Sequence, residues 1–544
     1  MKKLVYLLLA AVMSFSVFGA VGCKPKTPDD SENVLEVFCT DKGYGTKWCS
    51  DLMDLFQQQD WVKDKYPNLT VLPLRANDVE NFTASRIDAG EKNNSIDLFF
   101  DTSLGWDYMG VGPSGKERCA DLTETVYNSL VPGEEDRGVK VVDKILSSYN
   151  MVNAYYDPND PTADTKYYFM SWAGGMEGLL YNKDLLDEMG LKTPNTTDEL
   201  DAVCAAIAAR RDSADGKYNL GYSFIQSKDA DYWAYLFNIW WAQYQGAQGF
   251  TDFWNGVDEN RISKNIFTQK GRIRALEVYE KLLKYDKGYL NPSSGTYDFK
   301  TAQTMFLKGN GVFHANGDWF DNEMSSIRAD VKSQQGLDYD IRMLRTPVMS
   351  SIVETLENKE MTDETLSAVI TAVDEGKTSF DGVSAADFAK IREARSIVYS
   401  VGSAHVSAIP AYAAGKDVAM DFLRFMATDV ANESYIRSTG GASLPVKYNV
   451  IEKNPELYAS LSTLQKSRLE YFNNGAFEIY TLPQERAFPL YRYGDVKPFS
   501  SAAYYATFSA EGNKKTPADY QRETELTWTD AKWTKAVNDA GLTN

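Results

Sequence analysis

The sequence contains 544 residues, carries a formal net charge of −19 at pH 7 and has only two histidines. Its length predicts more than one hydrophobic core, since single cores stop growing at roughly 250–300 residues. The acidic charge argues against a nucleic-acid partner, because phosphate binding needs a basic surface. Two histidines leave little material for a metal site or a hydrolase triad, and no Gly-x-Ser-x-Gly motif occurs. We therefore expect no metal, no cofactor and no enzymatic activity.

The first residues have the three parts of a bacterial export signal. Lys2 and Lys3 supply positive charge, residues 4–12 are almost wholly apolar, and residues 20–22 are small and precede Cys23. The apolar run is short for a bilayer span of about 20 residues. The segment resembles a lipobox, although Ala20 stands where leucine is commoner. This pattern predicts cleavage before Cys23 and a lipid on that cysteine.

A retained anchor helix and secretion without lipid are the alternatives at the N-terminus. Ser14, Ser16 and Gly19 interrupt the later half of the apolar run, and residues 24–30 (KPKTPDD) have the composition of a disordered tether. We therefore expect residues 1–22 to form a signal peptide and residues 23–33 a lipidated tether. The mature chain would then lie at the outer face of the cell membrane, extracellular or periplasmic.

Strands and helices alternate directly after the tether. The predicted elements are a strand at 34–38, a helix at 48–56, a strand at 69–74, a helix at 79–89 and a strand at 96–100. This order predicts an α/β domain with a largely parallel sheet. Ligands bind beyond the carboxyl ends of such strands, so the loop that contains Tyr44 and residues 101–103 should share one edge.

Helical patterns dominate the rest of the chain. Predicted helices cover residues 183–189, 197–210, 230–244, 272–285, 297–307, 362–394 and 417–427, and predicted strands cover 311–315 and 341–348. No short-period internal repeat interrupts this order. The chain is thus predicted to be a large α/β protein.

Four segments in this order resemble the sugar-type extracellular solute-binding proteins (family 1) of bacterial ABC importers. They are residues 178–200, which begin GLLYNKDLL; residues 301–319, which end VFHANGDW; residues 409–426, which end AMDFLRFM; and residues 440–445, GGASLP. Asp198 departs from the family, where tryptophan is usual at this position. No single motif is specific, but the order extends over nearly the whole mature chain.

The resemblance implies two α/β lobes with a ligand cleft between them, a periplasmic-binding-protein-like fold. Carried onto this sequence, lobe one takes residues 34–166 and 340–440, and lobe two takes 167–339 and 441–544. Residues 350–400 exceed what compact relatives need and are interpreted as a helical insertion on lobe one. The implied function is capture of a carbohydrate, an oligosaccharide rather than a monosaccharide, and delivery to an ABC transporter permease by a monomeric protein.

Carbohydrates present flat CH faces and many hydroxyl groups, so their sites combine aromatic planes with short polar or charged side chains. The chain is 13% aromatic and has 11 tryptophans, although any single ring is more often part of a core. Position in the chain therefore selects the candidates. The predicted ligand-binding residues are Trp319, Trp172, Tyr44, Asp101, Asp318, Trp241, Gly402, Ser403 and Arg486.

Two of these tryptophans are candidates because of the segments that precede them in the sequence. Trp319 ends the sequence Asn-Gly-Asp-Trp after the strand at 311–315, where the family places a stacking ring. Trp172 follows the first crossing between lobes, and the glycines at 174 and 175 admit close approach of a ligand. Trp240 and Trp241 are adjacent on a helix, so at most one of them should reach the cleft.

The remaining candidates come from loops. Tyr44 lies between two glycines, and the carboxylate of Asp101 follows a strand end, where it could accept two hydroxyl hydrogens. Gly402 and Ser403 follow the predicted insertion, and Arg486 lies in an aromatic stretch near the C-terminus. Each of these positions would place a polar group or an aromatic plane at the cleft.

Two further patterns leave alternatives open. Cys39 and Cys49 could form a local disulfide, but buried free thiols explain these residues, Cys119 and Cys204 equally well. The acidic segment 212–218 could hold calcium, but no glutamate closes it and a surface turn is favoured.

Two other functions remain as alternatives to transport. A surface glycoside hydrolase would share the aromatic residues, the acidity and the anchor, and it needs two carboxylates about 5–10 Å apart. A peptide or polyamine binder on the same fold is the second alternative.

Overall fold

The computed structural model describes residues 33–542, except residues 103, 113, 161, 212–220, 229–231, 474–475 and 498–500; the side chains of residues 403 and 501–503 are also outside the description. The predicted signal peptide, Cys23 and the possible calcium loop therefore lie outside the described residues. Within the described part, no helix has the length and apolar character needed to cross a membrane.

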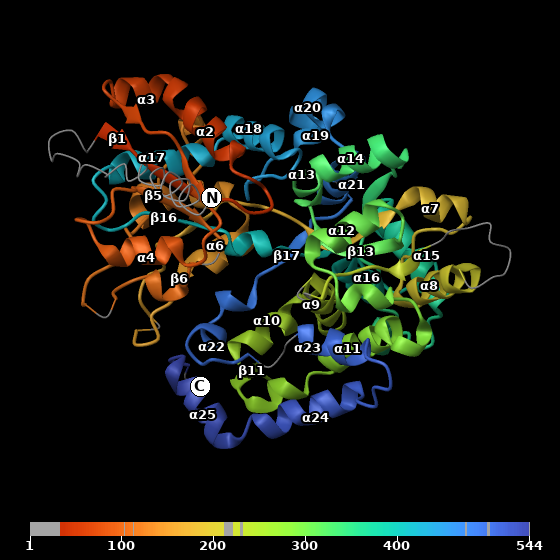
Figure 1. Ribbon diagram of the computed structural model, residues 1–544. Helices are drawn as coiled ribbons and strands as arrows, with labels where there is room; N and C mark the ends of the chain where they lie inside the picture. The colour runs from red at the N-terminus through yellow and green to blue at the C-terminus, as the bar shows by residue number, and fades with distance from the viewer. Residues whose placement is uncertain are drawn as a thin grey trace, which may run out of the picture.

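The first lobe is built on a five-stranded sheet. Its order is β4 (Arg75–Asn77), β2 (Val37–Thr40), β5 (Leu98–Asp101), β16 (Val406–Ala408) and β8 (Met170–Ser171). The strands β4, β2 and β5 are parallel, and β16 runs antiparallel to β5 and β8. This lobe lies at the left of Figure 1, around β5 and β16. The predicted α/β character is confirmed.

An amphipathic helix covers this sheet next to the candidate site. In α2 (Lys47–Gln58), the buried residues Trp48, Leu52 and Phe56 recur every four positions, so they share one face. That face packs against α18 (Asp429–Thr439) and α17 (Lys416–Met426). The contact joins segments that are far apart in the sequence and fixes the start of α2, which directly follows the Tyr44 loop.

The second lobe is built on a six-stranded sheet. Its path is β10 (Tyr222–Phe224), β13 (Gly311–Gly317), β9 (Glu177–Asn182), β15 (Ile397–Tyr399) and β17 (Tyr480–Leu482), with β14 (Ile341–Leu344) also paired to β9. The aromatic helix α9 (Tyr232–Gln245) packs on α11 (Lys270–Leu283) and α10 (Ala247–Asn255). Because α9 is buried along most of its length, it carries aromatic residues on every face.

The C-terminal segment connects the two lobes below the sheets. Helices α24 (Pro517–Thr527) and α25 (Asp530–Asp539) lie at the bottom of Figure 1, and α23 (Ser501–Phe508) and α24 pack on α11. From α22 (Pro489–Arg492), the guanidinium of Arg492 donates to the carbonyl of Ala154 at 2.7 Å and lies 4.3 Å from the ring of Trp106. This extension thus contacts lobe one directly.

The chain passes between the sheets three times, and the three crossing segments lie side by side. They join β8 to β9 (residues 172–176), β15 to β16 (residues 400–405), and α18 to α21 (Thr463–Phe472), the last by way of residues 440–446. The amide of Gly174 donates to the carbonyl of Ser443 at 2.7 Å, and the amide of Trp172 donates to the carbonyl of His405 at 2.9 Å. The crossings therefore form one connected hinge.

The strands divide the chain differently from the predicted lobe boundaries. We expected residues 340–440 in lobe one, but β14 and β15 pair with β9 in the sheet of lobe two. The predicted insertion forms α15 (Asp363–Asp374) and α16 (Ala385–Ser396), and α16 packs on α9, so it belongs to lobe two as well. Only from residue 406 onward does this part of the chain enter the first sheet. The apolar strands of residues 341–344 and 397–399 explain the difference, because each buries itself beside β9.

Candidate functional site

The loop after β2 carries Tyr44 to the junction of the lobes. Gly45 adopts a left-handed conformation with φ of 64°, which glycine reaches without the steric penalty of a Cβ atom. The indole of Trp48 then donates to the carbonyl of Gly45 at 3.0 Å and holds the turn on α2. Tyr44 is 3% exposed, and its ring centre lies 6.2 Å from Trp319 and 6.1 Å from Trp172.

The end of β13 carries Asp318 and Trp319 to the same place from the second lobe. The ring of Trp319 packs on Gly43, where an added Cβ atom would lie 3.1 Å from Cγ of the indole. The side-chain amide of Asn322 also donates to the carbonyl of Gly43 at 2.7 Å. Glycine at position 43 therefore allows the two lobes to approach closely at this point.

A buried polar cluster lies behind these aromatic rings. The Tyr44 hydroxyl donates to Oδ1 of Asp318 at 2.9 Å, and Nε of Arg468 lies 3.5 Å from Oδ2 of the same carboxyl. Glu177, the first residue of β9, accepts the amide of Val401 at 2.8 Å. Asp318, Glu177 and Arg468 are each 1% exposed. Two carboxyls and one guanidinium thus share a site that excludes water.

Burial dominates the electrostatics of this cluster. It raises the pKa of Glu177 well above the usual range; the charge of Asp318 adds to the effect, and Arg468 opposes it. Burial likewise raises the pKa of Asp318, whereas the charge of Arg468 and the hydrogen bond from the Tyr44 hydroxyl lower it. The pKa of His405, whose ring centre lies 6.0 Å from Tyr44, is lowered to about 4 by burial first and by the charge of Arg486 second. His405 is therefore neutral at physiological pH.

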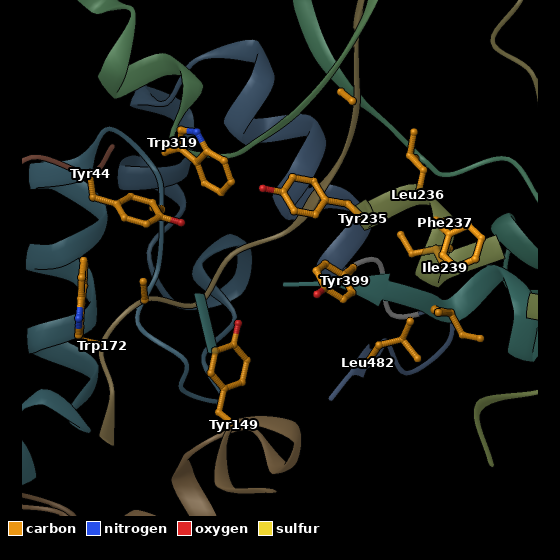
Figure 2. Packing of buried hydrophobic residues seen from close by; sticks show 14 of the residues in the cluster. Tyr44, Tyr149, Trp172, Tyr235, Leu236, Phe237, Ile239, Trp319, Tyr399 and Leu482 are labelled. Carbon is orange, nitrogen blue, oxygen red and sulfur yellow. The ribbon is translucent and has the colours of Figure 1, made fainter. Parts of the chain in front are cut away.

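Three tyrosines that the sequence did not single out complete the junction. Figure 2 shows Tyr44 and Trp319 on one side and Tyr235 and Tyr399 on the other, with the hydroxyl of Tyr149 pointing toward the space between them. Tyr235 stacks on Tyr399 at 5.7 Å and meets Trp319 edge-on at 6.5 Å. The only available signal was position: Tyr235 lies in the aromatic helix, and Tyr399 directly precedes the second crossing.

Trp172 lies at the junction as predicted, but its ring is covered. It is 1% exposed and stacks on Trp48 at 4.9 Å and on His405 at 5.1 Å. Its indole nitrogen donates to the backbone carbonyl of Asp101 at 3.1 Å, and the Asp101 carboxylate accepts the hydroxyl of Thr83. In this arrangement, Trp172 packs against Tyr44, and Asp101 holds the Trp172 indole in place.

Trp241 does not reach the junction. It is fully buried among Phe250, Phe253 and Trp254, and its indole nitrogen donates to the side chain of Gln269 at 3.1 Å. The physical reason is the burial of α9 on nearly all sides, which places this ring against α10. Trp241 is therefore a core residue of lobe two, in contrast to the prediction.

The remaining predicted residues lie on the hinge or beside it. Gly402 packs so closely on the first crossing that an added Cβ atom would lie 2.5 Å from the carbonyl oxygen of Ala173. The side chain of Ser403 lies outside the described residues. The guanidinium of Arg486 lies 5.7 Å from the ring of Trp106, and the Tyr399 hydroxyl donates to the adjacent Glu485 at 3.4 Å.

The cysteines and the acidic residues build no metal site in the described part of the chain. Cys39, Cys49, Cys119 and Cys204 are buried free thiols. No group of three or more histidine, cysteine, aspartate or glutamate side chains there is arranged to hold a metal ion. The polar chemistry at the junction is therefore that of hydroxyls, carboxyls and one guanidinium.

Comparison with known sequences identifies a family match. A model of the family described as bacterial extracellular solute-binding protein matches residues 59–433, more than half of the chain. No curated protein sequence matches this chain.

Solved structures of bacterial proteins share the fold. One reported for xylan utilization by the thermophilic bacterium Caldanaerobius polysaccharolyticus is 15% identical, covers 91% of this chain and 100% of its own length, and gives a TM-score of 0.54. A probable secreted solute-binding lipoprotein from Streptomyces coelicolor is 13% identical over 91% and 98% of the two chains, with a TM-score of 0.53. A Streptococcus pneumoniae solute-binding protein in complex with the blood group A-trisaccharide is 16% identical over 91% and 99%, with a TM-score of 0.50. At these identities the similarity shows the fold alone, and it confirms the predicted two-lobed architecture.

Proposed function

Because the chain belongs to the bacterial extracellular solute-binding proteins, we propose that it captures an oligosaccharide between its lobes and delivers it to the permease of an ABC importer. Ligand would bridge the lobes, and hinge motion about the three crossings would close them around it. The protein would act as a monomer and without covalent chemistry. This function requires that both lobes supply ligand-binding groups.

The observation that carries the proposal is the meeting of Tyr44 with Asp318 and Trp319. Tyr44 comes from the first lobe, and Asp318 and Trp319 come from the second. An indole and phenol rings supply planes for sugar CH faces, and carboxyl oxygens accept hydrogen bonds from sugar hydroxyls. Tyr235, Tyr399 and Tyr149 extend this surface, as Figure 2 shows. A flat and hydroxyl-rich ligand fits this combination better than an apolar one does.

The named ligands of similar structures point in the same direction. The pneumococcal structure holds the blood group A-trisaccharide, and a second similar structure is named a chitin oligosaccharide binding protein. We infer from these names and from the number of rings that the ligand here contains several sugar units.

The proposed location is the outer face of the cell membrane. Cys23 and the small residues before it support a lipid anchor, and the composition of residues 24–30 is typical of a tether. Such an anchor would keep the binding protein close to the permease, to which the closed form would dock. Mass spectrometry of the mature protein from its native membrane tests the anchor, which would show as an N-terminal cysteine that carries acyl chains.

No observation at the junction favours hydrolysis over binding. Asp318 and Glu177 form a carboxyl pair, but the Tyr44 hydroxyl bonds to Asp318 and the Val401 amide bonds to Glu177. A glycosidase would need one such carboxyl to face the scissile bond and the other to face the sugar or a water. A peptide or polyamine ligand is the other alternative, and the experiment below includes these compounds.

A thermal-shift screen with oligosaccharides, peptides and polyamines tests the proposal, because a ligand that binds only the native state raises the melting temperature. We expect an oligosaccharide to give the largest shift, and Trp319→Ala to abolish that shift. Trp61→Ala, the same change on the half-buried outer helix α3 (Asp60–Lys65), is the matched control and should retain it. Cleavage of the oligosaccharide, or full binding by Trp319→Ala, would overturn the proposal.

A further inference from the structure

The polar cluster at the hinge carries more negative than positive charge when it is fully ionised. Asp318 and Glu177 each contribute a carboxyl, and Arg468 contributes a cation that contacts Asp318 and whose charge acts on both carboxyls. All three side chains are almost completely buried. An uncompensated charge in such a place is costly, so the cluster favours the uptake of a proton.

The two carboxyls lie close together around Gly175. A Cβ atom added to this glycine would lie 3.0 Å from Oδ1 of Asp318, 3.0 Å from the Tyr44 hydroxyl and 3.1 Å from Oε1 of Glu177. Three oxygen atoms therefore converge on one point of the first crossing. A side chain at this position would crowd all three oxygen atoms, so glycine favours their convergence.

Hydrogen bonding in the cluster is incomplete without an added proton. Oδ2 of Asp318 and Oε1 of Glu177 are buried and have no hydrogen-bond donor within the described part of the chain. A proton on one carboxyl would supply a donor and would leave a single carboxylate opposite Arg468. The charge and the hydrogen bonds would then both be balanced.

The cover of this cluster comes from the first lobe. Tyr44 donates to Asp318, Tyr149 accepts the amide of Gly175 at 3.2 Å, and Tyr435 of α18 is a fully buried neighbour. Separation of the lobes would remove Tyr44 from Asp318 and admit water. The protonation of the carboxyls is thus coupled to the distance between the lobes.

We propose that closure of the lobes takes up one proton, shared by Asp318 and Glu177, so that acidity favours the closed form and rising pH favours the open form. The proposal describes regulation of the same junction, and it rests on the proposed function only for the existence of lobe opening. It requires no ligand, because the proton balances the cluster of the empty protein.

The sign of the effect follows from burial. In the open form, solvated carboxyls titrate near their usual pKa of about 4. In the closed form the pKa of both carboxyls is raised, first by burial. The closed form therefore binds more protons from about pH 4 up to the raised pKa. Within this range the ratio of closed to open molecules falls by up to about tenfold per pH unit.

Other titratable groups that face the pair do not reproduce this effect. The phenols keep their protons because burial raises their pKa. The pKa of His405 is lowered to about 4, so it stays neutral. The pKa of Asp321 is raised by burial, but its partners Ser462 and Arg328 belong to lobe two. The facing groups are Tyr44, Tyr149, Tyr399, Tyr435, Arg468, Asp321 and His405, with Cys39 behind Tyr435.

Single-molecule energy transfer measures the ratio of closed to open molecules directly. Dyes on Asp60→Cys of lobe one and Lys332→Cys of lobe two would label two exposed positions, whereas the four native cysteines of the described residues are buried. Cys23 is replaced by serine in the labelled protein. We expect the closed fraction of the ligand-free protein to fall as the pH rises from 5 to about 8. Glu177→Gln should remove this dependence and remain closed, because one carboxylate then faces one guanidinium.

Asp321→Asn is the matched control, since it removes a neighbouring carboxyl of raised pKa and should preserve the pH dependence. If Glu177→Gln does not fold, Asp318→Asn tests the same loss of one carboxyl. A closed fraction that is constant with pH, or an unchanged pH dependence in Glu177→Gln, overturns the inference. Either result would leave oligosaccharide binding intact, whereas absence of binding with an intact pH dependence would overturn only the proposed function.

Discussion

The hydroxyl of Tyr44 donates a 2.9 Å hydrogen bond to Oδ1 of Asp318, and this contact joins residues 274 positions apart in the sequence. Both side chains are buried, and each follows the end of a central strand in its own lobe. The bond therefore ties the carboxyl edges of the two sheets together at one point. Removal of the Tyr44 hydroxyl oxygen would therefore weaken the contact between the lobes.

Tyr44→Phe is expected to shift the lobes toward the open form. The substitution removes one donor from a buried carboxyl while it keeps the ring, and such a loss costs about 1–3 kcal/mol. The closed fraction in single-molecule energy transfer should fall accordingly. Tyr458→Phe removes a hydroxyl that bonds to Glu470 at 2.5 Å on the surface and should leave the closed fraction unchanged. If Tyr44→Phe and Tyr458→Phe changed the closed fraction equally, the hydrogen bond from Tyr44 to Asp318 would not be what stabilises the closed form.

Trp241→Ala tests the assignment of this ring to the core. Loss of a fully buried tryptophan typically costs about 3–5 kcal/mol through lost burial and cavity formation. We expect a large fall in the urea midpoint, with oligosaccharide affinity preserved at temperatures where the variant is folded. If affinity were lost while the urea midpoint stayed unchanged, Trp241 would belong to the ligand site after all.

A buried ion pair makes the insertion of lobe two sensitive to acid. Asp374 accepts two hydrogen bonds from Arg395, at 3.0 and 2.7 Å, and Arg345 lies 2.8 Å away. Burial alone would raise the pKa of Asp374, but these two guanidinium groups outweigh it and lower the pKa. The stability that this pair contributes is thus present above the usual pKa of about 4 and is lost as the pH falls below it.

Asp374→Asn is expected to mimic that loss at neutral pH. It would leave Arg395, which is 3% exposed, without its full counter-charge, at a cost of about 3–5 kcal/mol. Hydrogen exchange of residues 350–396 should rise in the variant, and in the native protein below about pH 4. Glu375→Gln removes a surface partner of Lys377 and should cost less than about 1 kcal/mol. Unchanged exchange in Asp374→Asn would show that other contacts hold the insertion.

Gly174→Ala tests the packing of the crossing segments. An added Cβ atom would lie 2.9 Å from the carbonyl oxygen of Leu444 and 2.9 Å from Cα of Pro445, and backbone atoms cannot yield as a flexible side chain can. We expect a loss of about 1–3 kcal/mol in urea unfolding. Gly295→Ala, which meets nothing within 4 Å, is the control and should be close to neutral. Similar urea midpoints in the two variants would show that the hinge tolerates the change.

Local sequence patterns predicted much of the fold. The helices at 197–211, 270–283 and 416–426 and the strand at 311–317 follow periodicities and breaker residues that the chain carries itself. The division into lobes failed for residues 341–399 because strand pairing is not local. An apolar strand such as Ile397–Tyr399 fits either sheet, and only its neighbours determine which one it joins.

The candidate site was predictable where a residue directly follows a strand. Tyr44, Asp318 and Trp319 were predicted in this way, and the structure brings them together. Tyr235 and Tyr399 were missed, because nothing in their own segments separates an aromatic residue at the junction from one in the core. Trp241 shows the converse error: it was predicted to reach the cleft, but its ring lies in the core of the second lobe.

The sequence by itself predicted an export signal with its cysteine, and it carried the order of helices and strands and the resemblance that the family match confirms. These features depend on neighbouring residues, whose chemistry acts over short distances along the chain. Only the tertiary structure decided which aromatic rings meet between the lobes and which two carboxyls share Arg468. Glu177, Asp318 and Arg468 lie far apart in sequence, and each would be solvated and ordinary in the unfolded chain. Burial together at the hinge, away from water, is what raises the pKa of Glu177 and Asp318.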